Sequence, residues 1–238
     1  MRLLIGPATT PLTALMAQHL GLQAMPYADT APHHATQAVV LLPYRETPDA
    51  QDLVHQALRA VDRWGPRPAM LLSNAGVFDP RNPGVRRESD AADAADTFGQ
   101  SLAAVEAAFV RRGANRPIVR LPAPIAHVPE AGALLALKAG QPVRAGAYQG
   151  FDPATLAALL EPCAQIHLTH LACGPVPAEA IADALGNGLQ ETPHLWDTGW
   201  DRLRTQWSEQ WGRPDGLASA RRDTLPALVA LASGNTAA

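Results

Sequence analysis

Short apolar runs alternate with amphipathic stretches along the first half of the chain. Apolar runs typical of strands buried in a parallel sheet recur, in chain order, at 2–6, 22–27, 38–43, 69–73 and 117–121. Helical patterns, with apolar residues at the spacing of one helix face, occur at 11–20, 49–64 and 96–113. This alternation predicts an α/β fold with a Rossmann-like, doubly wound parallel sheet.

The pattern is less regular after residue 122. It predicts helices and one strand, the helices at 130–139, 153–161, 177–186 and 224–232 and the strand at 166–172. Four of the five tryptophans fall in the tail, at Trp196, Trp200, Trp207 and Trp211. We expect these tryptophans to anchor a C-terminal cap on the core. The alternative is that they form a stacking surface for a ligand. We therefore predict a Rossmann-like nucleotide-fold domain at 1–124 and a smaller C-terminal α/β part, of the substrate-binding type, at 125–238.

Composition narrows the classes of function. Hydrophobic residues make up 47% and charged residues 17% of the chain, which is enough apolar material for a core. The net charge of −3 gives no electrostatic reason to expect a nucleic acid or an acidic membrane as partner. No apolar run approaches the roughly 20 residues of a membrane span, and Gly6 and Pro7 interrupt the N-terminal run that a signal peptide would need. Because Cys163 and Cys173 are too few for a disulfide framework, we predict a cytoplasmic protein.

The first strand, turn and helix meet at Gly6-Pro7-Ala8-Thr9-Thr10-Pro11, where a dinucleotide fold would hold a pyrophosphate. Glycine fills only one position of the expected glycine-rich register, and Pro7 and Pro11 lack the N–H donors that an anion would use. The turn therefore favours a plain connection over a phosphate site. Asp29 follows the second strand, where a ribose ligand would stand, with a solvated turn residue as the alternative. The candidate cofactor-binding residues are Gly6, Thr9, Thr10 and Asp29.

One group of residues has a spacing similar to that of a metal-ligand set: Cys163, His167, His170 and Cys173. Side chains alternate along a strand, so His167 and His170 would point to opposite faces of the strand predicted at 166–172. We therefore predict no metal site.

Isolated polar residues stand near the expected strand ends and are candidates for lining a substrate cleft: Tyr44, Ser73, Asp79 and His127. Their spacing assigns no Ser/His/Asp or Cys/His pairing. A hydrolytic triad is therefore not predicted from these residues.

Four segments carry a more specific signal because they occur in a fixed order. They read AVVLLPYRETPDAQDLVHQALRAVDRWG, AMLLSNAGVFDP, RRESDAADAADTFGQSLAAVE and IVRLPAPIAH. The third is similar to ExxPxxPxxxYGxSKxxxE, with Glu88, Gly99, Ser101 and Glu106 in register, and the fourth is similar to xLRxxxVYGP, with Arg120 retained. In this order the segments resemble the extended short-chain dehydrogenase/reductase family, which includes the nucleotide-sugar epimerases and dehydratases.

The resemblance implies a role for each matching position. The family's general acid/base Tyr corresponds to Phe98, and the Lys that lowers that tyrosine's pKa and holds the nicotinamide ribose corresponds to Leu102. The substrate-orienting Ser or Thr corresponds to Asn74, which follows Ser73. Phe has no proton to transfer and Leu has no charge to shift a neighbouring pKa. The resemblance also places Asn74 and Arg120 in the substrate cleft.

The cofactor half of the predicted fold is also short. Only about ten residues separate Tyr27 from Ala38, whereas a crossover that includes a helix needs on the order of a dozen. The resemblance implies NAD or NADP as a candidate cofactor, but the segment that would bind its adenosine half is shortened.

We interpret the chain as an NAD(P)-dependent epimerase/dehydratase-like protein that is degenerate for redox catalysis. In this hypothesis it acts as a ligand-binding, regulatory or accessory protein, and its ligand is a small molecule or nucleotide sugar. The alternative is an enzyme that uses the same cleft for a non-standard reaction. The resemblance also implies a homodimer formed through the helices near 49–64 and 97–112.

Overall fold

The computed structural model describes the larger part of the chain: residues 1–8, 11–29, 33–45, 47, 49–79, 81, 86–113, 116–121, 139–141, 143–144, 147–148, 153–171, 176–188 and 191–192. The chain divides into two compact units. The first consists of Met1–Asp79, Ser89–Leu121 and Ala157–Thr169, and the second of Pro80–Glu88, Pro122–Leu156 and His170–Ala238. The predicted domain boundary at 124 lies outside the described residues and stays a prediction.

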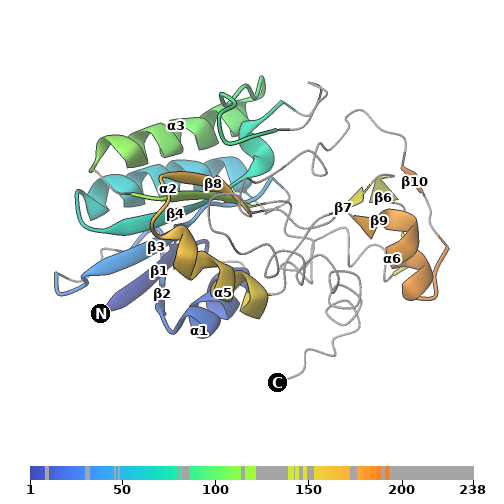
Figure 1. The fold of residues 1–238 in the computed structure, drawn as a ribbon, viewed down its shortest axis with the longest axis horizontal. Coiled ribbons are helices and arrows are strands. Elements are labelled where there is room, and N and C mark those ends of the chain that lie inside the picture. Colours follow the sequence, from blue (N-terminus) through green and yellow to red (C-terminus); the bar gives the residue numbers. More distant parts are fainter. Residues whose placement is uncertain are drawn as a thin grey trace. The chain divides into compact units, whose positions relative to one another are not determined.

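A six-stranded sheet forms the centre of the fold, in the order β2-β1-β3-β4-β5-β8 (Figure 1). The strands are β1 (Arg2–Gly6), β2 (Gln23–Pro26), β3 (Gln37–Leu41), β4 (Ala69–Asn74), β5 (Ile118–Leu121) and β8 (Leu168–His170). The pairs β1–β2, β1–β3, β3–β4 and β4–β5 are all parallel. Every residue of β4 and of β5 is buried, as expected for strands covered on both faces. The predicted α/β fold with a Rossmann-like parallel sheet is confirmed.

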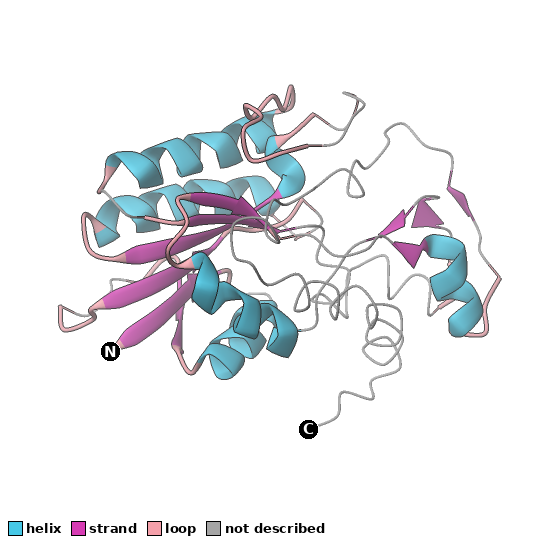
Figure 2. Cartoon of the chain, viewed as in Figure 1, coloured by secondary structure: helices cyan, strands magenta, loops and turns pink. Residues whose placement is uncertain are grey.

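Helices cover the sheet on both sides. Figures 1 and 2 show α2 (Ala50–Trp64) and α3 (Thr97–Arg111) on one face, and α1 (Pro11–Leu20) and α5 (Pro153–Cys163) on the other. Helices α2 and α3 pack against each other. Each buries one stripe at helical spacing, which in α3 includes Phe98, Leu102, Val105 and Phe109. Hydrophobic burial of these stripes holds the two helices on the sheet.

The connection from β2 to β3 is short, as predicted. In the described residues between these strands there is no helix, and β2 forms the edge of the sheet. An Arg63 side-chain nitrogen donates a hydrogen bond to the Tyr27 carbonyl oxygen, which ties the end of this edge strand to α2. In the described part of the chain, no further strand or crossover helix therefore lies beyond β2 at this edge.

The described part of the second unit contains short elements. Strand β6 (Val143–Arg144) pairs in parallel with β10 (Glu191–Thr192), and β7 (Ala147–Tyr148) pairs antiparallel with β9 (Val176–Pro177), which leads into α6 (Ala178–Ala184). The predicted helix at 177–186 corresponds to α6. The predicted helix at 224–232 and the tail tryptophans lie outside the described residues, as does all but the last residue of the helix predicted at 130–139.

Among the described helices, none has the length and apolar character needed to cross a membrane.

Gly65 provides a test of the local backbone geometry, because it ends α2 at φ 68° and ψ −145°. A side chain is strained in this region at a cost of about 1–3 kcal/mol. Gly65→Ala is therefore expected to lower the free energy of unfolding by about that amount in urea denaturation. Gly113→Ala is the control, because a Cβ there would meet its nearest atom, Arg116 Cδ, at an ordinary 3.5 Å. Equal losses in the two variants would contradict the prediction.

Candidate functional site

Phe98 and Leu102, the positions that match the family's Tyr and Lys, point into the core from the first turns of α3. Their exposed fractions are 7% and 0%. A Cβ built on Gly76 would lie 3.0 Å from Leu102 Cδ1 and 3.3 Å from Phe98 Cε1, so both side chains pack directly against this glycine. Gly76 belongs to a short 3-10 helix, η1 (Ala75–Val77), that follows β4. The two side chains therefore serve as packing residues.

Asn74, the position of the substrate-orienting residue, stands at the end of β4 and is 1% exposed. Its Nδ2 donates to the Pro43 carbonyl oxygen at 3.0 Å, and its Oδ1 accepts from the Gly76 N–H at 3.0 Å. The amide therefore joins the segment after β3 to the start of η1. Ser73 is equally buried, and within the described part of the chain its hydroxyl has no hydrogen-bond partner.

Gly99 has a steric role that does not depend on catalysis. A Cβ at this position would lie 2.4 Å from the Gly76 carbonyl oxygen and 2.3 Å from the Ala94 Cβ. Real Cβ atoms do not approach this closely, so α3 can meet η1 only through a glycine. Packing alone therefore explains the glycine at this motif position.

An ion pair closes over the Phe98 ring. The Arg45 guanidinium carbon lies 4.9 Å from the ring centroid, and Arg45 Nη2 donates to Asp96 Oδ2 at 2.9 Å. Asp96 is the N-cap of α3 and its Oδ1 accepts from the Gly99 N–H at 3.0 Å. Partial burial acts to raise the pKa of Asp96, but the hydrogen bonds from Arg45 and Gly99 outweigh it, so this pKa lies below its ordinary value. The Arg45 charge over the Phe98 ring is thus paired with the carboxylate that caps α3.

Arg120, predicted for the substrate cleft, is bound to Glu106 of α3. Its Nε donates to Oε1 at 3.0 Å and its Nη2 donates to Oε2 at 2.7 Å, and the two side chains are only 5% and 8% exposed. The guanidinium carbon also lies 5.0 Å from the Phe78 ring centroid. This bidentate pair links β5 to α3, so two residues that match motifs of the resembling family are bound to each other in the core.

Of the remaining predicted cleft residues, Tyr44 follows β3 and Asp79 follows η1. The Tyr44 N–H donates to Thr47 Oγ1 at 3.3 Å, and the Asp79 N–H donates to Asp93 Oδ1 at 2.9 Å. Tyr44 is 3% exposed. It lies in the same segment as Pro43, which contacts Asn74, so the structure brings the ends of β3 and β4 together. His127 lies outside the described residues.

At the predicted cofactor turn, a threonine on α1 fills the space beside Gly6. A Cβ on Gly6 would lie 2.8 Å from Thr13 Oγ1, and that hydroxyl donates to the Pro7 carbonyl oxygen at 2.8 Å. Thr13 therefore explains this glycine without a phosphate. Asp29 is exposed, and its N–H donates to the Pro26 carbonyl oxygen in a turn at 3.2 Å. Thr9 and Thr10 lie outside the described residues.

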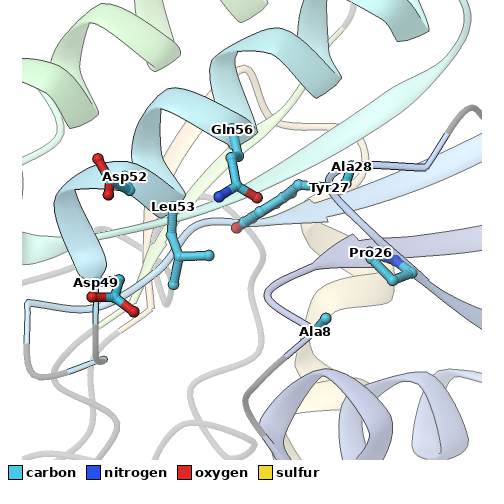
Figure 3. A pocket seen from close by; sticks show the side chains of 8 residues that line it. All are labelled: Ala8, Pro26, Tyr27, Ala28, Asp49, Asp52, Leu53 and Gln56. Atoms are coloured by element: carbon cyan, nitrogen blue, oxygen red, sulfur yellow. The ribbon is translucent and has the colours of Figure 1, made fainter.

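A pocket of about 270 Å³ opens where β1 and β2 end beside the first turns of α2 (Figure 3). Its lining residues are Ala8, Pro26, Tyr27, Ala28, Asp49, Asp52, Leu53 and Gln56. The Tyr27 hydroxyl donates to the Leu41 carbonyl oxygen. Burial raises the pKa of Tyr27 well above its ordinary value, and Tyr44 raises it further, so the phenol stays a neutral donor. No motif in the sequence pointed to this pocket, although Tyr27 directly follows a strand end.

The metal-ligand spacing noted in the sequence brings no site together in the described residues, where no group of three or more His, Cys, Asp or Glu is placed to bind an ion. His167 precedes β8 and is exposed, whereas His170 is fully buried and its N–H donates to Glu88 Oε1 at 3.0 Å. Burial raises the pKa of the Cys163 thiol to about 12, and its sulfur donates to the Leu159 carbonyl oxygen. Cys163 is therefore a core residue.

Solved structures of epimerases and reductases share this fold. The chain aligns with a dTDP-4-dehydrorhamnose reductase from Clostridium acetobutylicum at a TM-score of 0.68 and 12% identity, covering 89% of this chain and 93% of that one. It aligns with the human epimerase family protein SDR39U1, solved with NADPH, at a TM-score of 0.61 and 16% identity over 99% of both chains. The Bordetella bronchiseptica enzyme WbmG, solved with NAD and UDP, aligns at 0.65 and 15% identity over 98% of this chain and 95% of that one.

No protein-family model matches the sequence, and no curated protein matches it. The structural alignments nevertheless give the class of the fold: it is that of the NAD(P)-dependent epimerases and reductases of the extended short-chain dehydrogenase/reductase type. The resemblance predicted from the sequence is confirmed at this level.

The Arg120–Glu106 pair yields a prediction that separates a core role from a ligand-binding role. Glu106→Leu and Arg120→Met are each expected to lower the free energy of unfolding by about 3–5 kcal/mol, because each removes one half of a buried bidentate ion pair. The double variant is expected to lose much less than the sum. The exposed pair Arg112–Asp62, at 2.7 Å and 47% and 44% exposed, is the control. Single losses as small as those at the exposed pair would contradict a core role.

Proposed function

We propose that this chain is a catalytically degenerate protein on an epimerase/reductase fold, which binds a small molecule in a ligand-binding, regulatory or accessory role. The observation that carries the proposal is the burial of Phe98 and Leu102 against Gly76. General acid/base catalysis needs a side chain that exchanges a proton and can reach the reacting atom. Neither side chain can exchange a proton, and both are used for packing.

Three further contacts support the proposal. Asn74 is engaged through both ends of its amide with the backbone, and Arg120 is engaged with Glu106. Both contacts stabilise the end of the sheet where the reaction would take place. The space beside Gly6 is filled by Thr13, which weakens the case for a bound pyrophosphate.

The related structures indicate the class of ligand to test. SDR39U1 was solved with NADPH and WbmG with NAD and UDP. We therefore include nucleotides and nucleotide sugars among the candidate ligands of this chain.

The proposal includes a homodimer formed through α2 and α3. Within one chain these helices are joined by polar contacts, between Gln51 and Ser101 at 2.9 Å and between Asp62 and Arg112 at 2.7 Å. Light scattering would measure the molar mass in solution, and a mass of twice that of one chain would support the homodimer.

The direct test is hydride transfer. We expect no oxidation of NADH or NADPH above the uncatalysed rate with keto-sugar nucleotides as acceptors, because the side chains at the two matching positions, Phe98 and Leu102, cannot supply a proton. The dTDP-4-dehydrorhamnose reductase, assayed with its own substrate, is the positive control. Turnover by the wild-type chain that is lost in Asn74→Ala would overturn the proposal and favour the alternative, an enzyme that uses the same cleft.

A stability measurement tests whether the former Lys position still tolerates a charge. Leu102→Lys is expected to lower the free energy of unfolding by several kcal/mol, because an ammonium would be buried at a site with no solvent access. Leu102→Met conserves volume and is expected to cost less than about 1.5 kcal/mol. If Leu102→Lys proved as stable as Leu102→Met, the position could host the catalytic Lys and the proposal would lose its structural basis.

A further inference from the structure

Tyr27 lies across the carboxyl end of β1. It follows β2, its hydroxyl reaches the Leu41 carbonyl oxygen at the end of β3, and β1 lies between these two strands. The side chain together with its hydrogen bond therefore connects the two strands that flank β1. At 1% exposure it is part of the core. Figure 3 shows its ring pointing from the end of β2 toward the side chains of Leu53 and Gln56 on α2.

The position of this side chain matters because the strand order reverses at β1. From β1 the chain builds β2 on one side and β3, β4 and β5 on the other. In open α/β sheets a ligand binds at such a switch point, and a dinucleotide lays its pyrophosphate across it. Here that place is crossed by a phenol ring, and the adjoining turn offers Pro7, which has no N–H to donate.

The pocket that remains beside Tyr27 is small. Its volume of about 270 Å³ is below the roughly 300–1,000 Å³ of pockets that hold drug-sized ligands. A monosaccharide is small enough for such a space, whereas a dinucleotide is several times larger. The size of the pocket therefore selects a compact ligand.

The lining of the pocket selects against phosphate. Among the lining residues that the structure describes none is basic, and their polar groups are the carboxylates of Asp49 and Asp52, the Gln56 amide and Tyr27. Asp49 precedes α2 but makes no capping hydrogen bond with its side chain. Carboxylates accept hydrogen bonds from hydroxyl and ammonium groups and repel a phosphate. The carbon skeleton of a sugar would lie against Pro26 and Leu53.

We propose that Tyr27 is a specificity-determining residue, which closes the switch point to a dinucleotide and leaves a pocket for a compact polyhydroxylated molecule without phosphate, bound best when it carries an amine. This inference rests on the proposed function, since a chain that transferred hydride would need the dinucleotide that Tyr27 excludes. Beyond the proposed function, the inference names the chemical class of the ligand and identifies Tyr27 as the residue that determines this class.

Isothermal titration of the full chain with four probes tests the proposal: glucosamine, glucose, glucose 6-phosphate and NAD. For the wild type we expect glucosamine to bind at least about tenfold more tightly than glucose 6-phosphate, because a like charge is repelled by the two carboxylates. Asp49→Asn and Asp52→Asn should reduce that preference. Asp62→Asn, which changes an exposed acid of α2 outside the pocket, is the matched control and should keep it.

The same titration with NAD tests the role of the ring. The wild type and Tyr27→Phe, which keeps the ring, are expected not to bind NAD, whereas Tyr27→Leu should gain saturable binding. If Tyr27→Leu does not fold, Tyr27→Met, whose unbranched side chain adapts to an irregular buried space, carries the same comparison. The proposal is overturned if the wild type binds NAD as tightly as the smaller variants, if none of these variants gains binding, or if neither glucosamine nor glucose binds.

The outcomes keep the two proposals apart. NAD binding to the wild type without turnover would overturn the role of Tyr27 and leave the proposed function in place. Turnover of NADPH by the wild type, measured in a separate assay, would overturn the proposed function itself.

Discussion

The approach of α3 to the end of β4 is the contact on which the rest of the site depends. Two glycines make it possible: a side chain on Gly99 would collide with the Gly76 carbonyl oxygen, and one on Gly76 would meet Leu102 and Phe98. Because the backbones meet so closely, the first turn of α3 is held against η1. This contact directs Phe98 and Leu102 inward and places Asp96 where it can cap the helix and pair with Arg45.

That packing accounts for several motif positions without chemistry. Gly99 allows the close approach, Glu106 holds Arg120 in the core, and Asn74 joins two strand ends through its amide. Buried polar groups are retained when they have partners, since an unpaired one costs stability. In the resembling family, the start of α3 and the end of β4 carry the residues of proton transfer. In this chain the same segments are held together by contacts that stabilise the structure.

The cofactor side of the sheet follows a similar principle. A short connection from β2 to β3 leaves β2 at the edge, and Arg63 and Tyr27 attach that edge to α2 and β3. The Tyr27 ring occupies the switch point, and Thr13 fills the space beside Gly6. Tyr27 and Thr13 therefore fill space on either side of the turn that follows β1. A compact acidic pocket remains beside α2.

The sequence by itself determined the architecture and part of the site. Continuous apolar runs predicted the strands of the sheet, and helical patterns predicted α1, α2, α3, α5 and α6, because a strand between two layers of helices is buried on both faces and a helix on the sheet is buried on one. The apolar stripe of α3 already indicated that Phe98 and Leu102 belong to the core. Only the tertiary structure decided that Tyr27 crosses β1 to reach Leu41, and that Arg120 pairs with Glu106. Those contacts join residues distant in the chain, so strand order and helix placement, which no local pattern encodes, set which groups meet.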